Sequence, residues 1–179
     1  EAFQREHPDI DIRIEASDST VDLEVTDIDV AVRYAPADRM PPTARRLFGE
    51  SVTPMASPWL LKSGPRLKTP ADLLGHTLIE AADAYTPHLA WLTWRRWLDA
   101  NGLAQSQPKR WLSFNYAYQM TQADAYPDAR LVSPMAYWVM VSPHSAQRAE
   151  VNAFADWLAA QAVATRAVTG EGAATDVPA

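Results

Sequence analysis

The stretch that decides the fold is DIDVAVRYAP, residues 27–36, in which a short apolar run ends in Arg33 and Tyr34 before a turn at Pro36. The run is too short and too rich in β-branched residues for a helix, which favours a strand. We interpret it as a central strand of a covered, parallel sheet. Ligands of such sheets bind at the carboxyl ends of the strands, so we expect Tyr34 to lie at a site.

The residues before this strand predict its partner. IDIRIEA, residues 10–16, alternates isoleucine with charged residues, which is typical of a strand with one buried face. SDSTVDLEV, residues 17–25, predicts a short helix capped by Ser17 or Ser19. Strand, helix and strand at this spacing predict a βαβ unit with a parallel strand pair.

A second βα system follows. Residues 47–57 carry an extended apolar pattern and predict a strand that leaves the first unit. In KTPADLLGHTLIEA, Thr69 is a helix cap, Pro70 is the first helical residue and Gly75 ends the short helix before a strand over residues 77–81. The chain therefore predicts two α/β units.

The rest of the chain continues this α/β order. Residues 87–103 predict a tryptophan-rich helix, and its tryptophans are interpreted as core packing rather than a stacking platform for nucleobases. Residues 109–115 and 130–143 predict strands, and YAYQMTQA between them predicts a helix. A final helix is expected from its cap at Ser145, with a buried face made of Val151, Phe154, Trp157, Leu158 and Val163.

Composition excludes several functions. The chain has 179 residues, of which 47% are hydrophobic, and a net charge of -6, which offers no basic surface for a nucleic-acid backbone. The absence of cysteine excludes disulfides and thiolate metal sites. No apolar stretch is long enough to span a membrane, and the first residues have the pattern of a helix entered in mid-course. We therefore expect a segment that precedes this sequence, while composition leaves the cellular compartment undecided.

Catalytic motifs are absent from the sequence. It contains no glycine-rich phosphate loop, zinc-binding helix motif or serine-elbow motif. The four histidines, His7, His76, His88 and His144, are not spaced as metal ligands, and structural capping is the better interpretation. Acidic pairs such as Asp27 and Asp29 occur where strands begin, where solvated charge is usual. We therefore expect no enzyme activity, no cofactor and no metal.

The order of segments is more specific than any one motif. HPDIDIRIEASDSTVDLEVTDIDVAVRYAP, RRLFGESVTPMASPWLL, PADLLGHTLIE, YWVMVSP and a last FADWLAAQ helix together resemble the effector-binding domain of LysR-type transcriptional regulators. The likeness is to the bacterial subgroup of the glycine-cleavage activator and the β-lactamase regulator, and it extends from Phe3 to about Thr165.

This resemblance implies a type-2 periplasmic-binding-protein fold, in which two βα subdomains are joined by two crossover strands. We expect subdomain I over residues 1–53 and 137–168, subdomain II over residues 54–136, and a flexible tail over residues 169–179. The family pattern further implies a homodimer through this domain and a tetramer of the full-length regulator. Promoter DNA would be bound by an N-terminal helix-turn-helix that is absent here.

The sequence departs from the family pattern twice. It begins after the family's first strand and helix, whose N-terminus helps to hold the ligand. It also passes from Ala123 directly to Asp124, where the family has further helix and strand. A domain without those elements would expose sheet edge and core, so we expect residues to be missing from this sequence at that junction.

The resemblance implies a small-molecule effector, expected to carry a carboxylate, in a cleft between the subdomains. Ser17 and Asp18 could instead be helix caps, Tyr34 could serve packing alone, and Asp22 could be a first-turn partner of the helix dipole. The expected ligand-binding residues are Ser17, Asp18, Tyr34, Thr53, Asn115, Tyr116 and Tyr137, with Asp22 as an allosteric position.

Effector binding would favour one subdomain orientation and so change how the regulator contacts DNA. The alternative is a solute-binding protein of a transporter, which shares this fold. An enzyme on the same fold is a further alternative, although no nucleophile or base arrangement supports it.

Overall fold

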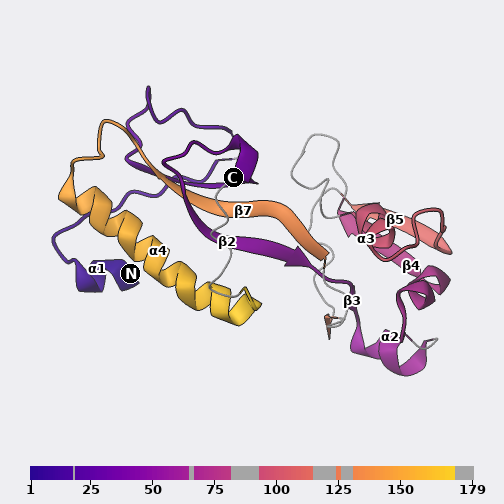
Figure 1. Cartoon of the computed structure of the whole chain (residues 1–179). Helices are drawn as coiled ribbons and strands as arrows, with labels where there is room; N and C mark the ends of the chain where they lie inside the picture. Colours follow the sequence, from indigo (N-terminus) through magenta and orange to yellow (C-terminus); the bar gives the residue numbers. More distant parts are fainter. Residues whose placement is uncertain (18, 65–66, 82–92, 115–123, 126–130, 172–179) are drawn as a thin grey trace. The chain divides into compact units, whose positions relative to one another are not determined.

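The computed structural model divides the chain into two compact units. Unit 1 comprises Glu1–Glu50 and Pro134–Ala179, and unit 2 comprises Ser51–Ser133 (Figure 1). The structure describes residues 1–17, 19–64, 67–81, 93–114, 124–125 and 131–171. Strands β2 (Arg45–Val52) and β7 (Leu131–Val141) each begin in one unit and end in the other. Among the described residues, no helix is long and apolar enough to cross a membrane.

Unit 1 is built on a three-stranded sheet in the order β1-β7-β2. Strand β1 (Val30–Pro36) pairs antiparallel with β7 through seven residue pairs, from Val30 opposite Val141 to Pro36 opposite Met135. A short 3-10 helix, η1 (Ala37–Arg39), follows β1.

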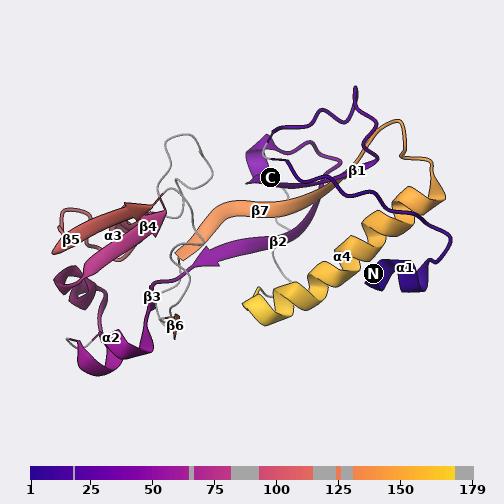
Figure 2. The same ribbon diagram turned by 180° about the vertical axis from the view of Figure 1, so that it is seen from behind.

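One long helix, α4 (Ala149–Thr169), lies along this sheet, as Figures 1 and 2 show from opposite sides. Its small residues Ala155 and Ala162 pack with Leu47 of β2 and Val139 of β7 in one buried cluster. These alanines are seven residues apart and therefore share one face of the helix.

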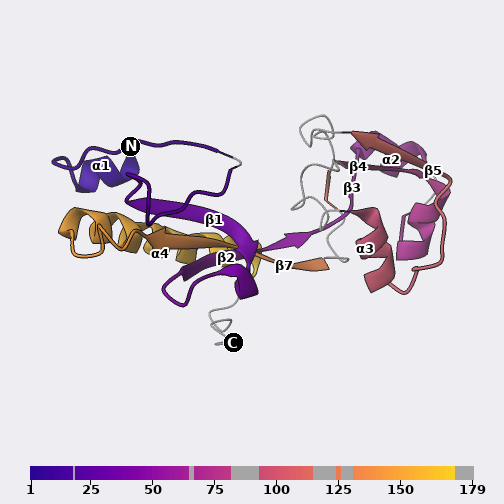
Figure 3. The same ribbon diagram turned by 90° about the horizontal axis from the view of Figure 1, so that it is seen from above.

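The N-terminal helix α1 (Ala2–Glu6) packs on α4 (Figure 3). Phe3 is buried, and its ring lies edge-on to Phe154 at 5.0 Å and to Trp157 at 5.6 Å between centroids. The predicted buried face of α4 is confirmed at Val151, and Phe154, Trp157 and Leu158 are partly buried, but Val163 is 63% exposed. Helix α4 begins after Arg148, so Ser145 is not its cap.

Unit 2 contains the parallel pair β4 (Thr77–Ala81) and β5 (Arg110–Phe114), connected in sequence through helix α3 (Trp94–Ala100). This confirms the predicted second βα system. Its core consists of Leu73, Leu78, Trp97 and Leu98, so the predicted packing role holds for Trp97. The short helix predicted before β4 is a 3-10 helix, η2 (Pro70–Gly75).

Two further pieces of unit 2 are short. Strand β3 (Met55–Ala56) pairs antiparallel with β6 (Asp124–Ala125), so the predicted strand over residues 47–57 is interrupted at Thr53 and Pro54. Helix α2 (Pro58–Ser63) begins at a proline after Ser57, whose Oγ accepts a hydrogen bond from the Leu60 N–H. The predicted helix YAYQMTQA, the first part of the tryptophan-rich helix and the residue before Asp124 lie outside the described residues.

Three predictions for the first unit were wrong. Residues 10–16 form no strand, and Ile14 is 83% exposed, because an alternating pattern needs a partner strand and none pairs with this segment among the described residues. Residues 19–25 form no helix, and only residues 23–25 form a turn. Strand β1 is antiparallel to β7 and lies at the end of the described sheet order, which leaves Val32 51% exposed.

Candidate functional site

Two of the predicted site residues are cross-strand neighbours. Tyr34 of β1 lies directly opposite Tyr137 of β7, and their ring centroids are 5.0 Å apart with an interplanar angle of 47°. Directly opposite residues of an antiparallel pair project from the same face of the sheet. Residues 103 positions apart in sequence are thus brought together by strand pairing alone.

Strand β2 adds two residues that the sequence analysis did not select. The Phe48 ring lies 4.8 Å from the Tyr137 ring, and a Glu50 carboxylate oxygen accepts a hydrogen bond from the Tyr34 hydroxyl. Phe48 and Glu50 are two residues apart on a strand and therefore share a face. This two-residue spacing was the one sequence signal that could have identified Phe48 and Glu50. We call Tyr34, Phe48, Glu50 and Tyr137 the aromatic face.

The aromatic face offers stacking surface together with polar groups. All four residues are half-buried, which leaves part of each accessible. Within the part of the chain that the structure describes, the Tyr137 hydroxyl has no hydrogen-bond partner, whereas that of Tyr34 is bonded to Glu50. Tyr137 can therefore donate to or accept from a bound molecule without breaking a contact.

Ser17 and Asp22 contact their own chain neighbours rather than this face. Ser17 is exposed and its Oγ accepts from the Ser19 N–H at 3.1 Å, while the Asp22 Oδ1 accepts from the Glu24 N–H at 2.9 Å. These are local turn contacts of the kind that serine and aspartate side chains make. Thr53 is half-buried between β2 and β3. Asp18, Asn115 and Tyr116 lie outside the described residues.

Arg33, the cation of strand β1, has a structural contact. Its Nη1 donates to the Val21 carbonyl at 3.1 Å, so the guanidinium holds the segment that precedes β1. The same segment is fixed at Asp29, whose Oδ1 accepts from Ser145 Oγ at 2.5 Å and from Arg148 Nη1 at 2.9 Å. Because both partners of Asp29 follow β7, these contacts secure the start of β1 against the end of its partner strand.

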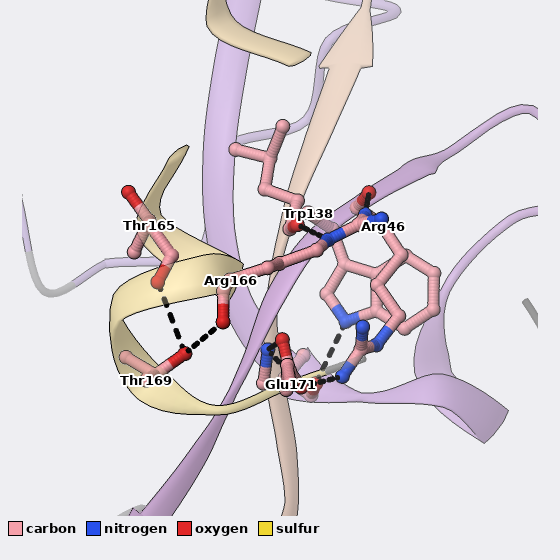
Figure 4. A network of polar contacts seen from close by, with 9 residues as sticks. Arg46, Trp138, Thr165, Arg166, Thr169 and Glu171 are labelled. Carbon is pink, nitrogen blue, oxygen red and sulfur yellow. Dashed lines mark hydrogen bonds and ion pairs between the residues drawn. The ribbon is translucent and has the colours of Figure 1, made fainter. Parts of the chain in front are cut away.

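A second polar cluster lies where α4 ends (Figure 4). Arg166 Nε donates to the Leu47 carbonyl at 2.5 Å, and its Nη2 donates to the Arg46 carbonyl at 2.7 Å. The Glu171 carboxylate accepts from the Gly49 N–H at 2.8 and 2.9 Å and forms an ion pair with Arg46 at 2.5 Å. We call Arg166 and Glu171 the C-terminal clamp. Glu171 falls within the tail expected from the sequence.

The charges of this cluster favour ionised Glu171. Burial of the carboxylate raises its pKa, but the hydrogen bonds from Gly49 and Arg46 and the charges of Arg46 and Arg166 outweigh burial, so the pKa of Glu171 lies below its usual range. The stabilisation from this depressed pKa is present at neutral pH and is lost as pH falls through the lowered value.

Histidines and metal ligands give no separate site in the described residues. His76 is buried after η2, His144 bonds the Glu24 carbonyl at 2.8 Å through Nε2, and the His7 ring stacks on Phe3. His88 lies outside the described part of the chain. No group of three histidine, cysteine, aspartate or glutamate side chains that could hold a metal occurs in those residues.

Comparison with known proteins gives consistent matches. The family model of the LysR substrate binding domain matches residues 1–125. The glycine cleavage system transcriptional activator of Escherichia coli (strain K12) is 28% identical over 187 residues, which cover 91% of this chain and 59% of that protein. The HTH-type transcriptional activator AmpR of Pseudomonas aeruginosa is 31% identical over 124 residues, which cover 69% of this chain and 38% of that protein.

Solved structures agree on the fold. The effector domain of AmpR from Pseudomonas aeruginosa has a TM-score of 0.68 at 21% identity, covering 96% of this chain and 90% of that one. The AmpR effector binding domain from Citrobacter freundii has a TM-score of 0.59 at 19% identity, covering 91% and 88%. These likenesses confirm the expected α/β, periplasmic-binding-protein-like fold. The chain spans about three fifths of the length of the glycine cleavage activators that it matches.

Proposed function

This chain belongs to the LysR substrate-binding-domain family, and on this premise we propose that it is the effector-binding part of a transcriptional regulator. Two observations support the proposal: the family match covers residues 1–125, and the similar curated proteins are named transcriptional activators. The same names count against the transporter alternative, and no relative named here is an enzyme.

The observation that carries the site assignment is the aromatic face. We propose that a small molecule binds there, with its flat or apolar part on the rings of Tyr34 and Tyr137 and a polar group on the Tyr137 hydroxyl. Glu50 would disfavour an anionic group beside Tyr34, because like charges repel at short range. The expected carboxylate of the effector should therefore bind away from Glu50, and Thr53, Asn115 and Tyr116 stay predicted ligand-binding residues.

The effector would act without chemistry. A ligand shifts a conformational equilibrium only by the difference in its affinity for the two states, so binding on β1, β2 and β7 must favour one arrangement of these strands. We propose that the regulator is a cytoplasmic homo-oligomer and that a further N-terminal segment binds promoter DNA. The dimer, the full-length tetramer and the effector's identity belong to this proposal.

Thermal unfolding of the intact protein against amino acids, organic acids and cell-wall fragments tests the assignment. A compound that binds the folded form raises the midpoint. We expect at least one compound to shift the wild type but not Tyr137→Phe, while Thr43→Val, which removes an exposed hydroxyl outside the aromatic face, responds as wild type does. A compound that shifts all three proteins equally would place the effector elsewhere.

A further inference from the structure

One edge of strand β2 is covered by the end of α4 and not by another strand of the described sheet. Because β2 is last in the order β1-β7-β2, one edge faces β7 and the other faces away. In a strand, alternate residues direct their backbone groups to the same edge. Leu47 and Gly49 are such a pair, and their groups are those that Arg166 and Glu171 contact. An open edge of this kind is a template for another strand.

The C-terminal clamp makes the hydrogen bonds that a neighbouring strand would make. The Arg166 guanidinium supplies the donor for the Leu47 carbonyl, and the Glu171 carboxylate supplies the acceptor for the Gly49 N–H. Figure 4 shows Arg166 in the last turn of α4 and Glu171 just after the helix, both beside Arg46 of β2. The Arg166 donor and the Glu171 acceptor therefore satisfy the Leu47 carbonyl and the Gly49 N–H, as a paired strand would.

The local sequence is suited to this contact. Gly170 has φ 76°, a left-handed conformation that glycine adopts readily, and it ends α4 so that the Glu171 N–H bonds the Arg166 carbonyl at 2.9 Å. Gly49 leaves room for the carboxylate, since a Cβ there would lie 2.3 Å from Glu171 Oε1. Gly170 thus suits the end of the helix, and Gly49 lets the Glu171 carboxylate and the Arg46 guanidinium approach the strand as closely as they do.

We propose that the C-terminal clamp is an autoinhibitory contact that prevents β2 from pairing with β2 of a second copy of this chain. The edge is self-complementary: an antiparallel partner placing its Gly49 opposite Leu47 would also place its Leu47 opposite Gly49. Both residue pairs would exchange N–H and C=O groups about a twofold axis centred on Phe48. A second copy therefore satisfies the Leu47 carbonyl and the Gly49 N–H that the clamp now covers, whereas the Arg46 carbonyl, which Arg166 also contacts, would lose that donor.

The test removes both side chains of the C-terminal clamp and measures the mass of the protein in solution. Light scattering of the intact double variant Arg166→Ala/Glu171→Ala is expected to show a concentration-dependent rise toward twice the wild-type mass. The matched control is Arg148→Ala/Glu150→Ala, which removes an ion pair of the same residue types at the start of α4, together with the Arg148 contact to Asp29, and leaves β2 untouched. The control should keep the wild-type mass.

Hydrogen exchange at Gly49 makes the test specific to the edge. In the released variant this amide should lose protection at low protein concentration and regain it at high concentration, while the buried Val139 amide stays protected throughout. A variant that stays folded at wild-type mass, or whose Gly49 amide keeps its protection at low concentration, would overturn the proposal.

A second variant is needed in case Arg166→Ala/Glu171→Ala does not fold. Gly49→Ala retains both charged side chains but puts a Cβ in the place of the carboxylate contact, so it should also raise the mass. If Gly49→Ala is folded, has lost the Glu171 contact and stays at wild-type mass, the clamp does not control pairing.

Discussion

Tyr34 and Tyr137 face each other across strands β1 and β7 with their ring centroids 5.0 Å apart, and only Tyr34 of the two directs its hydroxyl to a carboxylate, that of Glu50. Packing and polar roles are thus divided between two residues of the same type. Aromatic pairs contribute about 0.5–1.5 kcal/mol beyond their buried area, so the ring contacts can be separated experimentally from the hydroxyl groups.

Tyr137→Phe should leave stability nearly unchanged, within about 0.5 kcal/mol, because the ring contacts with Tyr34 and Phe48 remain and no hydrogen bond of the described residues is lost. Tyr137→Ala should cost at least about 1 kcal/mol, because both ring contacts disappear. Urea unfolding of the two variants measures this difference. Equal losses in both would show that the hydroxyl has a structural role.

Tyr34→Phe should destabilise the protein by about 0.5–1.5 kcal/mol, because the Glu50 carboxylate loses the donor of its hydrogen bond. A double-mutant cycle with Glu50→Ala, which removes the acceptor, measures the coupling. The loss in the double variant should be smaller than the sum of the single losses, since one contact is removed in each case. Strictly additive losses would mean that the two side chains do not interact in solution.

The sequence predicted elements whose cause is local. Thr69, Pro70 and Gly75 mark the start and end of η2 because capping and φ restriction act within a few residues. The family resemblance added the fold. The alternation of Ile10, Ile12 and Ile14 predicted a strand that does not form, because alternation describes a face but supplies no partner.

Contacts between distant residues could not be read from the sequence in the same way. Tyr34 and Tyr137 were each selected, but that they face each other depends on the β1–β7 register. The bond from Gly49 to Glu171 joins residues 122 positions apart and passes through a glycine that has no side chain to signal it. Glu50 was missed because one carboxylate on a strand looks like any solvated charge.

Lowering the pH should lower the free energy of unfolding of unit 1, because Glu171 becomes protonated. Its pKa is lowered in the native state, so the unfolded chain binds more protons in the acid range and stability falls as pH drops through that range. Glu171→Gln should be less stable than wild type at neutral pH by about 1–3 kcal/mol and should show a shallower loss toward acid. Urea unfolding at a series of pH values gives both slopes. Parallel curves would contradict the assignment.

Asp72 should stabilise unit 2 through the start of η2. Its Oδ2 accepts from the Lys68 N–H at 2.9 Å and the Thr69 N–H at 2.8 Å, and these hydrogen bonds lower the pKa of the carboxyl. Asp72→Ala should lower the free energy of unfolding, because the Lys68 and Thr69 N–H groups lose their acceptor. Asp99→Ala, near the end of α3, is the matched control and should be neutral or slightly stabilising. Denaturant unfolding of both variants checks this.

Strand β7 contributes to two separate hydrophobic clusters. Leu131, near its beginning, packs against the core of Leu73, Leu78, Trp97 and Leu98, whereas Val139, near its end, is buried with Leu47 and the alanines of α4. Deleting β7 would therefore remove a residue from each of the two clusters at once.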